Sequence, residues 1–197
     1  MSMTTVASEL TGEEQPSGNG VQLDATLLDF WRWRFRNLLF NDVRGVYGER
    51  LVAQLLEIAP PPRDSWAAYD LMTPEGVRVE VKTTAFLQAW NPTASTKKPV
   101  FSGLKGQAWT LETGYSGIAT YNADLYVFCL QIEQDITRWN ALDLAQWRFF
   151  LLPKATVEQR NCQSISLSAL RKCTRELTAC EFMQEARAMI TLISERL

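Results

Sequence analysis

The chain has 197 residues, 46% of them hydrophobic, and a formal net charge of −2. Its length suits one domain with a substantial core, and its charge excludes a broadly basic nucleic-acid coat, so any nucleic-acid surface must be a local patch. The chain contains no histidine, which excludes Ser-His-Asp and Cys-His catalysis in their usual form, His-based nucleases and His-containing zinc sites. Carboxylate, metal and lysine chemistry remain among the common hydrolytic mechanisms.

The N-terminal segment is rich in Ser, Thr, Glu and Gly. We expect residues 1–22 to form a disordered tail and residues 23–197 to form a single domain, because no internal repeat or interior linker interrupts them. No apolar run is long enough to span a membrane, and the N-terminus lacks a basic-then-apolar signal pattern. The sequence therefore predicts a protein without a membrane partner.

The first predicted helix follows Asp24, which can cap it. Its apolar face consists of Leu27, Leu28, Trp31, Phe35, Leu38 and Leu39. Arginines alternate with aromatics over residues 31–36, and they are interpreted first as the solvated side of an amphipathic helix. If the chain is a nuclease, Arg32 and Arg36, one turn apart, become candidate phosphate contacts.

A second helix is predicted from Asn41 or Asp42, either of which can cap it, to about Ile58, before three prolines. Its main apolar stripe consists of Val43, Val46, Tyr47, Leu51, Leu55 and Ile58. Glu49 lies off this stripe. It either points across the edge of the core toward the sheet or is a surface glutamate near the helix N-terminus, and both interpretations remain open.

Two glycines, Gly45 and Gly48, lie inside this second helix. Glycine weakens a helix interior relative to other residues. We therefore expect another segment to approach this turn closely.

Residues 66–84 predict a β-hairpin with strands over 66–72 and 77–84, joined by a Pro-Glu-Gly turn. Valines alternate with polar residues in the second strand, so Glu80 and Lys82 project from the same face. Centring the hairpin on Glu75 places Asp70 opposite Glu80, with Cβ atoms about 4.5–5.5 Å apart. A bulge after Gly76 would shift this register by one residue.

Asp70 and Glu80 could then bind one hard cation through oxygen, and Lys82 could orient or activate a water. Like charges placed opposite each other destabilise a sheet unless something binds between them, which is the kind of local conflict expected at a functional site. The alternative is a half-buried strand whose charged face is simply solvated.

Residues 85–122 predict a long irregular segment with interleaved lysines, glycines and aromatics. It either contacts a polymer with a charged backbone or is packed by its own aromatics, and both interpretations remain open. The candidate nucleic-acid contacts in this segment are Lys97, Lys98 and Lys105.

The remaining segments complete a mixed fold. Residues 124–132 form a near-continuous apolar run that predicts a central strand covered on both faces. A short helix or turn at 142–147, a strand at 148–153 and a helix from Ser166 or Ser168 to about Thr174 follow. The last helix has an apolar stripe, interpreted as core packing, at Phe182, Ala186, Met189, Ile190, Ile193 and Leu197.

The four cysteines, Cys129, Cys162, Cys173 and Cys180, contain no Cys-x-x-Cys pair. A structural zinc site and a disulfide framework are therefore not expected. They are interpreted as reduced cysteines of a cytoplasmic protein, with Cys129 in the core.

This order of elements and carboxylates resembles the PD-(D/E)XK nuclease superfamily, over roughly residues 45–152. Asp70 matches the superfamily's first strand carboxylate, Glu80 and Lys82 match its paired carboxylate and lysine, and Glu49 matches the acidic residue that many members carry on the preceding helix. Tyr69 stands where the name-giving proline would be. Segments 98–101, 123–128 and 146–147 also resemble bacterial endonuclease-like proteins.

The resemblance implies an α/β (α+β) fold with a restriction-endonuclease-like mixed central β-sheet flanked by helices. It implies four catalytic residues, Glu49, Asp70, Glu80 and Lys82. Asp70, Glu80 and the Val81 carbonyl would bind Mg²⁺ or Mn²⁺, with Glu49 completing the acidic cluster or helping to hold a second metal. Lys82 would position the attacking water against the scissile phosphate.

The leading expectation is a metal-dependent DNA endonuclease of bacterial restriction or defence type. DNA is then the expected partner, and cleavage of both strands would favour a homodimer. Two alternatives remain: a non-catalytic nucleic-acid-binding subunit of the same fold, and an unrelated α+β interaction protein whose acidic hairpin is only solvated.

Overall fold

The computed structural model describes residues 10–92 and 98–197. The chain divides into two compact units, Met1–Leu38 and Leu39–Leu197. The described part of the expected tail contains β1 (Ser17–Gly18) and β2 (Val21–Gln22), which pair as a short antiparallel hairpin. Disorder of residues 1–22 as a whole stays a prediction.

Helix α1 (Leu27–Phe35) follows this hairpin and starts two residues later than its predicted cap suggests. Thr26 caps it, because its hydroxyl accepts the Asp29 N–H while the Asp29 carboxylate accepts the Thr26 N–H. This reciprocal pair satisfies two N–H groups at the helix start, and Asp24 is therefore not the cap.

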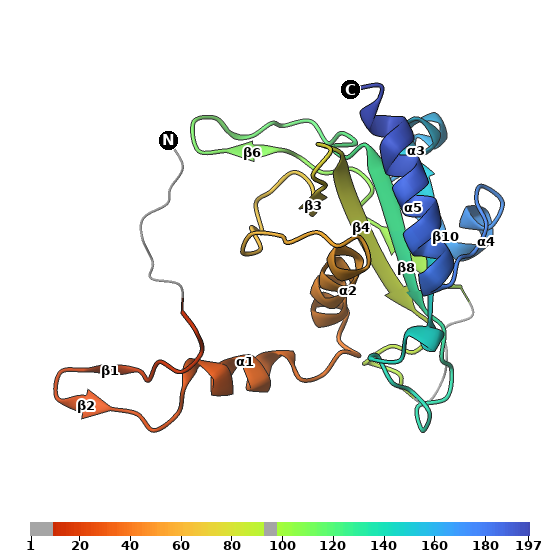
Figure 1. The fold of residues 1–197 in the computed structure, drawn as a ribbon. Coiled ribbons are helices and arrows are strands. Elements are labelled where there is room, and N and C mark those ends of the chain that lie inside the picture. The colour runs from red at the N-terminus through yellow and green to blue at the C-terminus, as the bar shows by residue number, and fades with distance from the viewer. Residues whose placement is uncertain (1–9, 93–97) are drawn as a thin grey trace. The chain divides into compact units, whose positions relative to one another are not determined.

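The second unit is built on a four-stranded mixed sheet with the strand order β3-β4-β8-β9 (Figure 1). β3 (Leu71–Met72) is antiparallel to β4 (Arg78–Ala85), which is parallel to β8 (Leu125–Gln131). β9 (Trp147–Pro153) is antiparallel to β8. Every residue of β8 is buried, including Cys129, which confirms the predicted central strand. The mixed sheet flanked by helices is the expected fold class.

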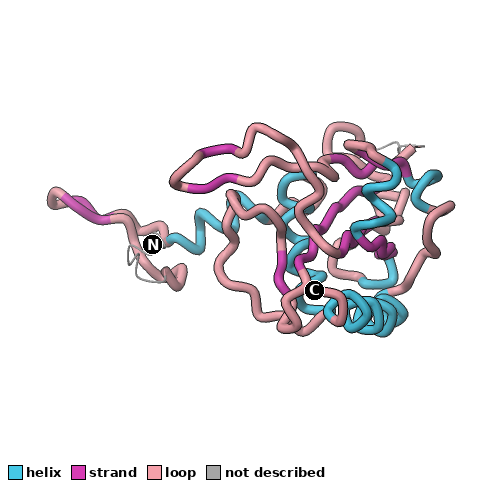
Figure 2. The backbone as a smooth tube through the Cα atoms, turned by 90° about the horizontal axis from the view of Figure 1, so that it is seen from above, coloured by secondary structure: helices cyan, strands magenta, loops and turns pink. Residues whose placement is uncertain are grey.

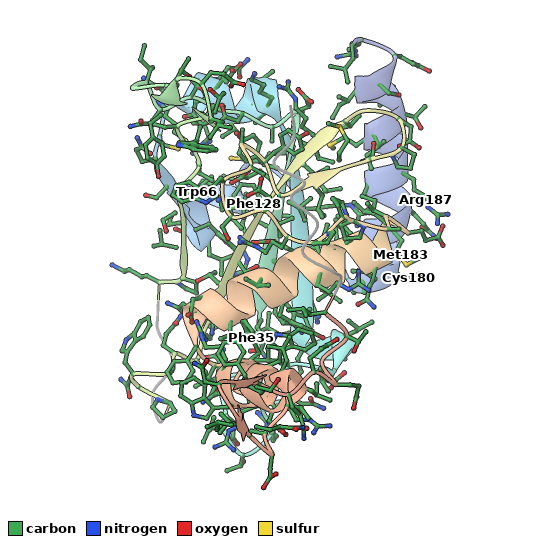
Figure 3. All side chains as sticks on the ribbon, turned by 90° about the vertical axis from the view of Figure 1, so that its left-hand side faces the viewer. Phe35, Trp66, Phe128, Cys180, Met183 and Arg187 are labelled. Carbon is green, nitrogen blue, oxygen red and sulfur yellow. The ribbon has the colours of Figure 1, made fainter. Side chains whose placement is uncertain are left out.

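Helices α2 (Asn41–Leu55) and α5 (Ala179–Ser194) cover one face of this sheet (Figures 1 and 3). Thr83, Cys129 and Phe149 lie in register on neighbouring strands, so their side chains share a face. Gly48 of α2 packs on Thr83, and Phe182 of α5 stacks on Phe149 with ring centroids 4.8 Å apart. The buried residues of α5 are Phe182, Ala186 and Ile190, which confirms this part of its predicted core stripe. The stripe is wrong at Leu197, which lies beyond the helix and is 71% exposed.

The opposite face is covered by β5 (Val100–Ser102), which pairs with β10 (Ser164–Ser166), and by α3 (Lys154–Arg160) and α4 (Leu167–Leu170). Phe128 of β8 meets Phe101 of β5 edge to face at 5.2 Å. Phe128 is labelled in Figure 3. Glu80 and Lys82 lie in register with Tyr126 and Phe128, so they belong to this face.

Two further details differ from the sequence-based expectations. Helix α2 ends at Leu55 rather than near Ile58, because Glu57 adopts a φ of +58°, a left-handed conformation that closes a helix. The irregular segment after β4 contains a hairpin of β6 (Trp109–Thr110) and β7 (Gly114–Tyr115), which projects beyond the central sheet (Figure 2). The turn before β9 is a single 3₁₀ turn, η1 (Leu144–Gln146).

Within the described ranges, no helix combines the length and apolar character needed to cross a membrane.

Candidate functional site

The hairpin that carries the candidate carboxylates has the predicted register. Leu71 pairs with Val79, so continuing the ladder by one step places Asp70 opposite Glu80. Gly76 takes a φ of +86° in the turn, a conformation that glycine adopts without strain. The one-residue shift considered for a bulge after Gly76 is absent from this ladder.

The first strand is much shorter than the predicted 66–72, because the Asp70 side chain replaces a main-chain partner. Its Oδ2 accepts the Val81 N–H at 2.7 Å, while its own N–H donates to the Val79 carbonyl at 3.1 Å. The N–H and C=O of a strand residue point to the same side, so the Val81 carbonyl also faces Asp70. The regular main-chain ladder of the hairpin therefore ends at this point, and the Asp70 side chain continues the contact with β4.

Glu80 and Lys82 form an ion pair on β4, with Nζ and Oε1 2.5 Å apart. Their side chains are only 16% and 21% exposed, which does not fit a simply solvated strand face. Gly103, in the loop after β5, lies beside Lys82: a Cβ at that glycine would be 3.7 Å from Nζ. This loop therefore helps to enclose the lysine.

Glu49 reaches this region from α2. Its side chain is 14% exposed and is held by Arg63, whose Nε and Nη2 donate to the two carboxylate oxygens at 2.5 and 2.9 Å. Glu49 thus points over the edge of the sheet and not into open solvent. Its negative charge contributes to raising the pKa of both Asp70 and Glu80.

Arg63 was not identified from the sequence. It is the single basic residue between Arg50 and Arg78, which marks it as unusual, but it stands in a loop after three prolines. No periodicity predicts where the side chain of such a residue points. Its pairing with Glu49 became visible only in the structure.

The site carries more negative charge than its basic residues neutralise. Burial, followed by the charges of Glu80 and Glu49, raises the pKa of Asp70 to about 7, against the opposing effects of the Val81 N–H and Lys82. Burial also raises the pKa of Glu80, and the neighbouring Lys82 partly offsets this rise. Such a setting favours an additional proton or cation.

Two of the three carboxylates already have basic partners. Arg63 holds Glu49, and Lys82 holds Glu80. Over residues 10–92 and 98–197, no three acidic or cysteine side chains stand together in an arrangement ready to hold a metal ion. A metal would have to compete with these two ion pairs.

Comparison with protein families identifies the chain. A family model described as bacteriophage T4 endonuclease IV matches residues 36–169, well over half of the chain. The chain belongs to the bacteriophage T4 endonuclease IV family. It is thus a member of a nuclease family, and the matched segment contains Glu49, Asp70, Glu80 and Lys82. A search of curated proteins returned no match.

The basic residues proposed as nucleic-acid contacts of this T4 endonuclease IV family member lie in different parts of the chain. Lys105 donates to the Asn161 side chain at 2.7 Å and lies 5.0 Å from the ring centre of Tyr121. Lys98 is exposed, and Lys97 lies outside the described residues. The ion pairs of the acidic cluster are instead formed by Arg63 and Lys82.

Arg32 and Arg36 belong to the first unit and are both exposed. Arg32 is 69% exposed and lies 3.7 Å from Asp29. This exposure fits both interpretations of the helix, as a solvated face and as a phosphate-binding face.

An aromatic cluster of the family member adjoins the segment that leads to Asp70. Trp66 lies 5.5 Å from Trp109 and 6.0 Å from Tyr115, measured between ring centres. Trp66 is labelled in Figure 3 and is 54% exposed. Exposed aromatic rings of this kind can stack on nucleobases. The sequence showed the residues but not that the hairpin of β6 and β7 brings them together.

Proposed function

We propose that this member of the T4 endonuclease IV family hydrolyses DNA phosphodiester bonds with Mg²⁺ or Mn²⁺ at a site of the PD-(D/E)XK type. The observation that carries the proposal is that Asp70 stands opposite Glu80 on the hairpin, with Lys82 paired to Glu80. The charge of Glu49 reaches both carboxylates, and all four residues lie inside the segment that matches the family. A bacterial restriction or defence role belongs to the same proposal.

The donor set suits a hard cation. Asp70, Glu80 and the Val81 carbonyl offer only oxygen ligands, which Mg²⁺ prefers, and Glu49 would join them when Arg63 releases it. Burial and the neighbouring negative charges, which together raise the pKa of Asp70, support this fit. When bound, the ion would stabilise the charge that develops on the phosphate and on the leaving oxygen.

The protein groups have separate tasks in this proposal. The Val81 N–H holds Asp70 in place, and Glu80 directs the Lys82 ammonium group. Lys82 donates hydrogen bonds to the attacking water and offsets the charge of the scissile phosphate. Arg63 is 44% exposed, so a phosphate could recruit its guanidinium after Glu49 is released.

The partner is DNA, bound through local contacts because the chain as a whole has a net charge of −2. The cluster of Trp66, Trp109 and Tyr115 offers ring faces for stacking. Cleavage of both strands would require two sites, and a symmetric homodimer supplies them most simply.

Metal binding tests the site directly. Titration calorimetry with Mn²⁺ should show binding by the wild-type chain and its loss in Asp70→Ala. Asp64→Ala, which removes an exposed carboxylate from the preceding loop, should bind as the wild type does. Equal binding by wild type and Asp70→Ala would contradict the proposed site.

Lys82 should be needed for cleavage but not for metal binding. We expect Lys82→Met to bind Mn²⁺ while its rate of DNA cleavage falls by roughly 100-fold or more. This is the usual effect of losing a group that stabilises charge in the transition state or transfers a proton to the reacting atoms. Full cleavage by Lys82→Met would exclude this role. Metal and DNA binding without any cleavage by the wild type would favour a non-catalytic nucleic-acid-binding subunit.

A further inference from the structure

A small pocket lies next to the candidate site, between the start of α2, the end of β4 and the segment that leads into β5. Its volume is about 240 Å³, below the roughly 300–1,000 Å³ of pockets for drug-sized ligands. A single heterocycle fits such a space better than a larger molecule. Thr84 lines the pocket and shares the β4 face of Lys82, about 7 Å further along the strand.

A buried arginine, Arg44, holds two of the residues that line the pocket, Asn41 and Gln88. Arg44 is 1% exposed and donates to the Leu39 carbonyl at 2.9 Å, to the Gln88 side-chain oxygen at 3.1 Å and to the side-chain oxygen of Asn41. Burial lowers the pKa of Arg44 to about 10, so the guanidinium remains charged at neutral pH. These three partners are neutral, and the Arg44 Nε has no partner among the described residues.

Arg44 thereby determines which atoms of the Asn41 and Gln88 side-chain amides remain available for hydrogen bonds to a ligand. It occupies the oxygens of Asn41 and Gln88, so their nitrogens are left for other partners. The Gln88 nitrogen donates one of its two hydrogens to the Ala85 carbonyl at 2.7 Å, which leaves the second. Asn41 and Gln88 both line the pocket, so two side-chain amides whose oxygens are held by Arg44 border it.

The remaining walls suit a flat ring. Trp90 lines the pocket and is 72% exposed, and Pro99 adds an apolar surface. Lys98 adds a positive charge to the same wall. An exposed indole with two amide donors matches a nucleobase, which has a stacking face and an edge with hydrogen-bond acceptors. A phosphate alone would use neither the indole nor the apolar wall.

We infer that this pocket binds one nucleobase of the nucleic-acid substrate, taken out of its stack, from the nucleotide beside the scissile phosphate. Asn41 and Gln88 donate hydrogen bonds to acceptors on the base edge, and Trp90 stacks on its face. The pocket would thus select which base stands next to the cleaved bond. This inference rests on the proposed function, because it assigns a base-selecting subsite to the same active site.

The test uses the full-length chain and the substitution Asn41→Asp, which keeps an oxygen for Arg44 but replaces the amide donor by an acceptor. Asn140→Asp, at an exposed asparagine, is the control with the same change in charge. Binding of labelled homopolymeric oligonucleotides of equal length is measured by fluorescence anisotropy in chelator, where metal-dependent cleavage cannot occur. Asn41→Asp should change the order of affinity among the four bases, whereas Asn140→Asp should keep the wild-type order.

A second measurement maps cut sites in mixed-sequence DNA with Mg²⁺. Asn41→Asp should change the base found next to the cut, and Trp90→Ala should reduce the cleavage rate roughly ten-fold or more through lost stacking. Trp90→Phe, which keeps an aromatic ring, should retain most of the wild-type cleavage rate.

The two proposals fail in different ways. An unchanged base order in binding, together with unchanged cut sites in Asn41→Asp, would overturn the pocket inference while the nuclease stands. A changed base order in binding, with no cleavage by the wild type, would support the pocket and overturn the proposed function.

Discussion

Asp70 carries a charge in surroundings that oppose it. The carboxylate is partly buried and close to Glu80 and Glu49, and its pKa is raised to about 7 as a result. A raised carboxyl pKa means that the folded protein holds a proton that the unfolded chain releases near pH 4. Asp70 therefore reduces stability increasingly as the pH rises from about 4 to 7, and the reduction is complete above pH 7.

Replacing Asp70 by Asn should make the metal-free protein more stable at alkaline pH. The amide oxygen can still accept the Val81 N–H, but the opposed charge is gone. We expect a gain on the order of 2 kcal/mol at pH 8, or roughly 4–8 °C in Tm, and almost none at pH 4. Thermal unfolding in chelator at both pH values measures this. A lower Tm for Asp70→Asn at pH 8 would contradict the account of its pKa.

At the scale of elements, the packing of α2 on β4 fixes the relation between Glu49 and the hairpin. A Cβ at Gly48 would lie 2.1 Å from Thr83 Oγ1 and 3.3 Å from Thr83 Cβ, so only glycine allows this approach. Gly45, three residues earlier, faces open space. The close approach expected from the two glycines is thus confirmed at Gly48 and wrong at Gly45.

The two glycines provide a matched pair of substitutions. Gly48→Ala should lower the free energy of unfolding by roughly 1–3 kcal/mol, because the methyl group forces α2 away from Thr83. Gly45→Ala should raise it by roughly 0.5–1 kcal/mol through better helix propensity. Urea denaturation of both variants measures the difference. Equal effects at the two positions would show that α2 does not approach β4 as described.

The sequence was sufficient where short periods determine the structure. The alternation around Val79 and the glycine turn predicted the hairpin register, and the apolar run at 124–132 predicted the central strand. The sequence was insufficient where a structure depends on which partner a single side chain binds. The Asp70 carboxylate binds the Val81 N–H, which shortens β3, and Arg63 binds Glu49 from a loop without periodicity. Arg44 binds Gln88, which lies 44 positions away along the chain, and no local pattern predicts such a contact.

At the scale of the whole molecule, the chain combines an acidic balance with a proposed substrate, DNA, that is itself negatively charged. Binding must therefore rely on a few basic side chains, and Arg32 and Arg36 are the candidates in the first unit. Each phosphate contact adds about 0.9 to the slope of affinity against salt concentration on a double logarithmic scale.

Replacing Arg32 and Arg36 together by Ala should weaken DNA binding and reduce this salt slope by roughly 1–2. Anisotropy titrations in chelator at several salt concentrations measure both quantities. The control replaces Arg175 and Arg187, which are equally basic and 56% exposed. An unchanged salt slope in the Arg32/Arg36 variant would assign these arginines to a solvated helix face.

DNA cleavage by the wild-type chain and by Glu80→Gln, measured side by side with Mg²⁺ and with chelator, tests the central claim most directly. Glu75→Gln, at the exposed turn of the same hairpin, is the matched control. We predict Mg²⁺-dependent cleavage by the wild type and by Glu75→Gln, and a loss of at least about 100-fold in Glu80→Gln. Cleavage that persists in Glu80→Gln, or that proceeds equally in chelator, would contradict a metal-dependent nuclease site at this hairpin.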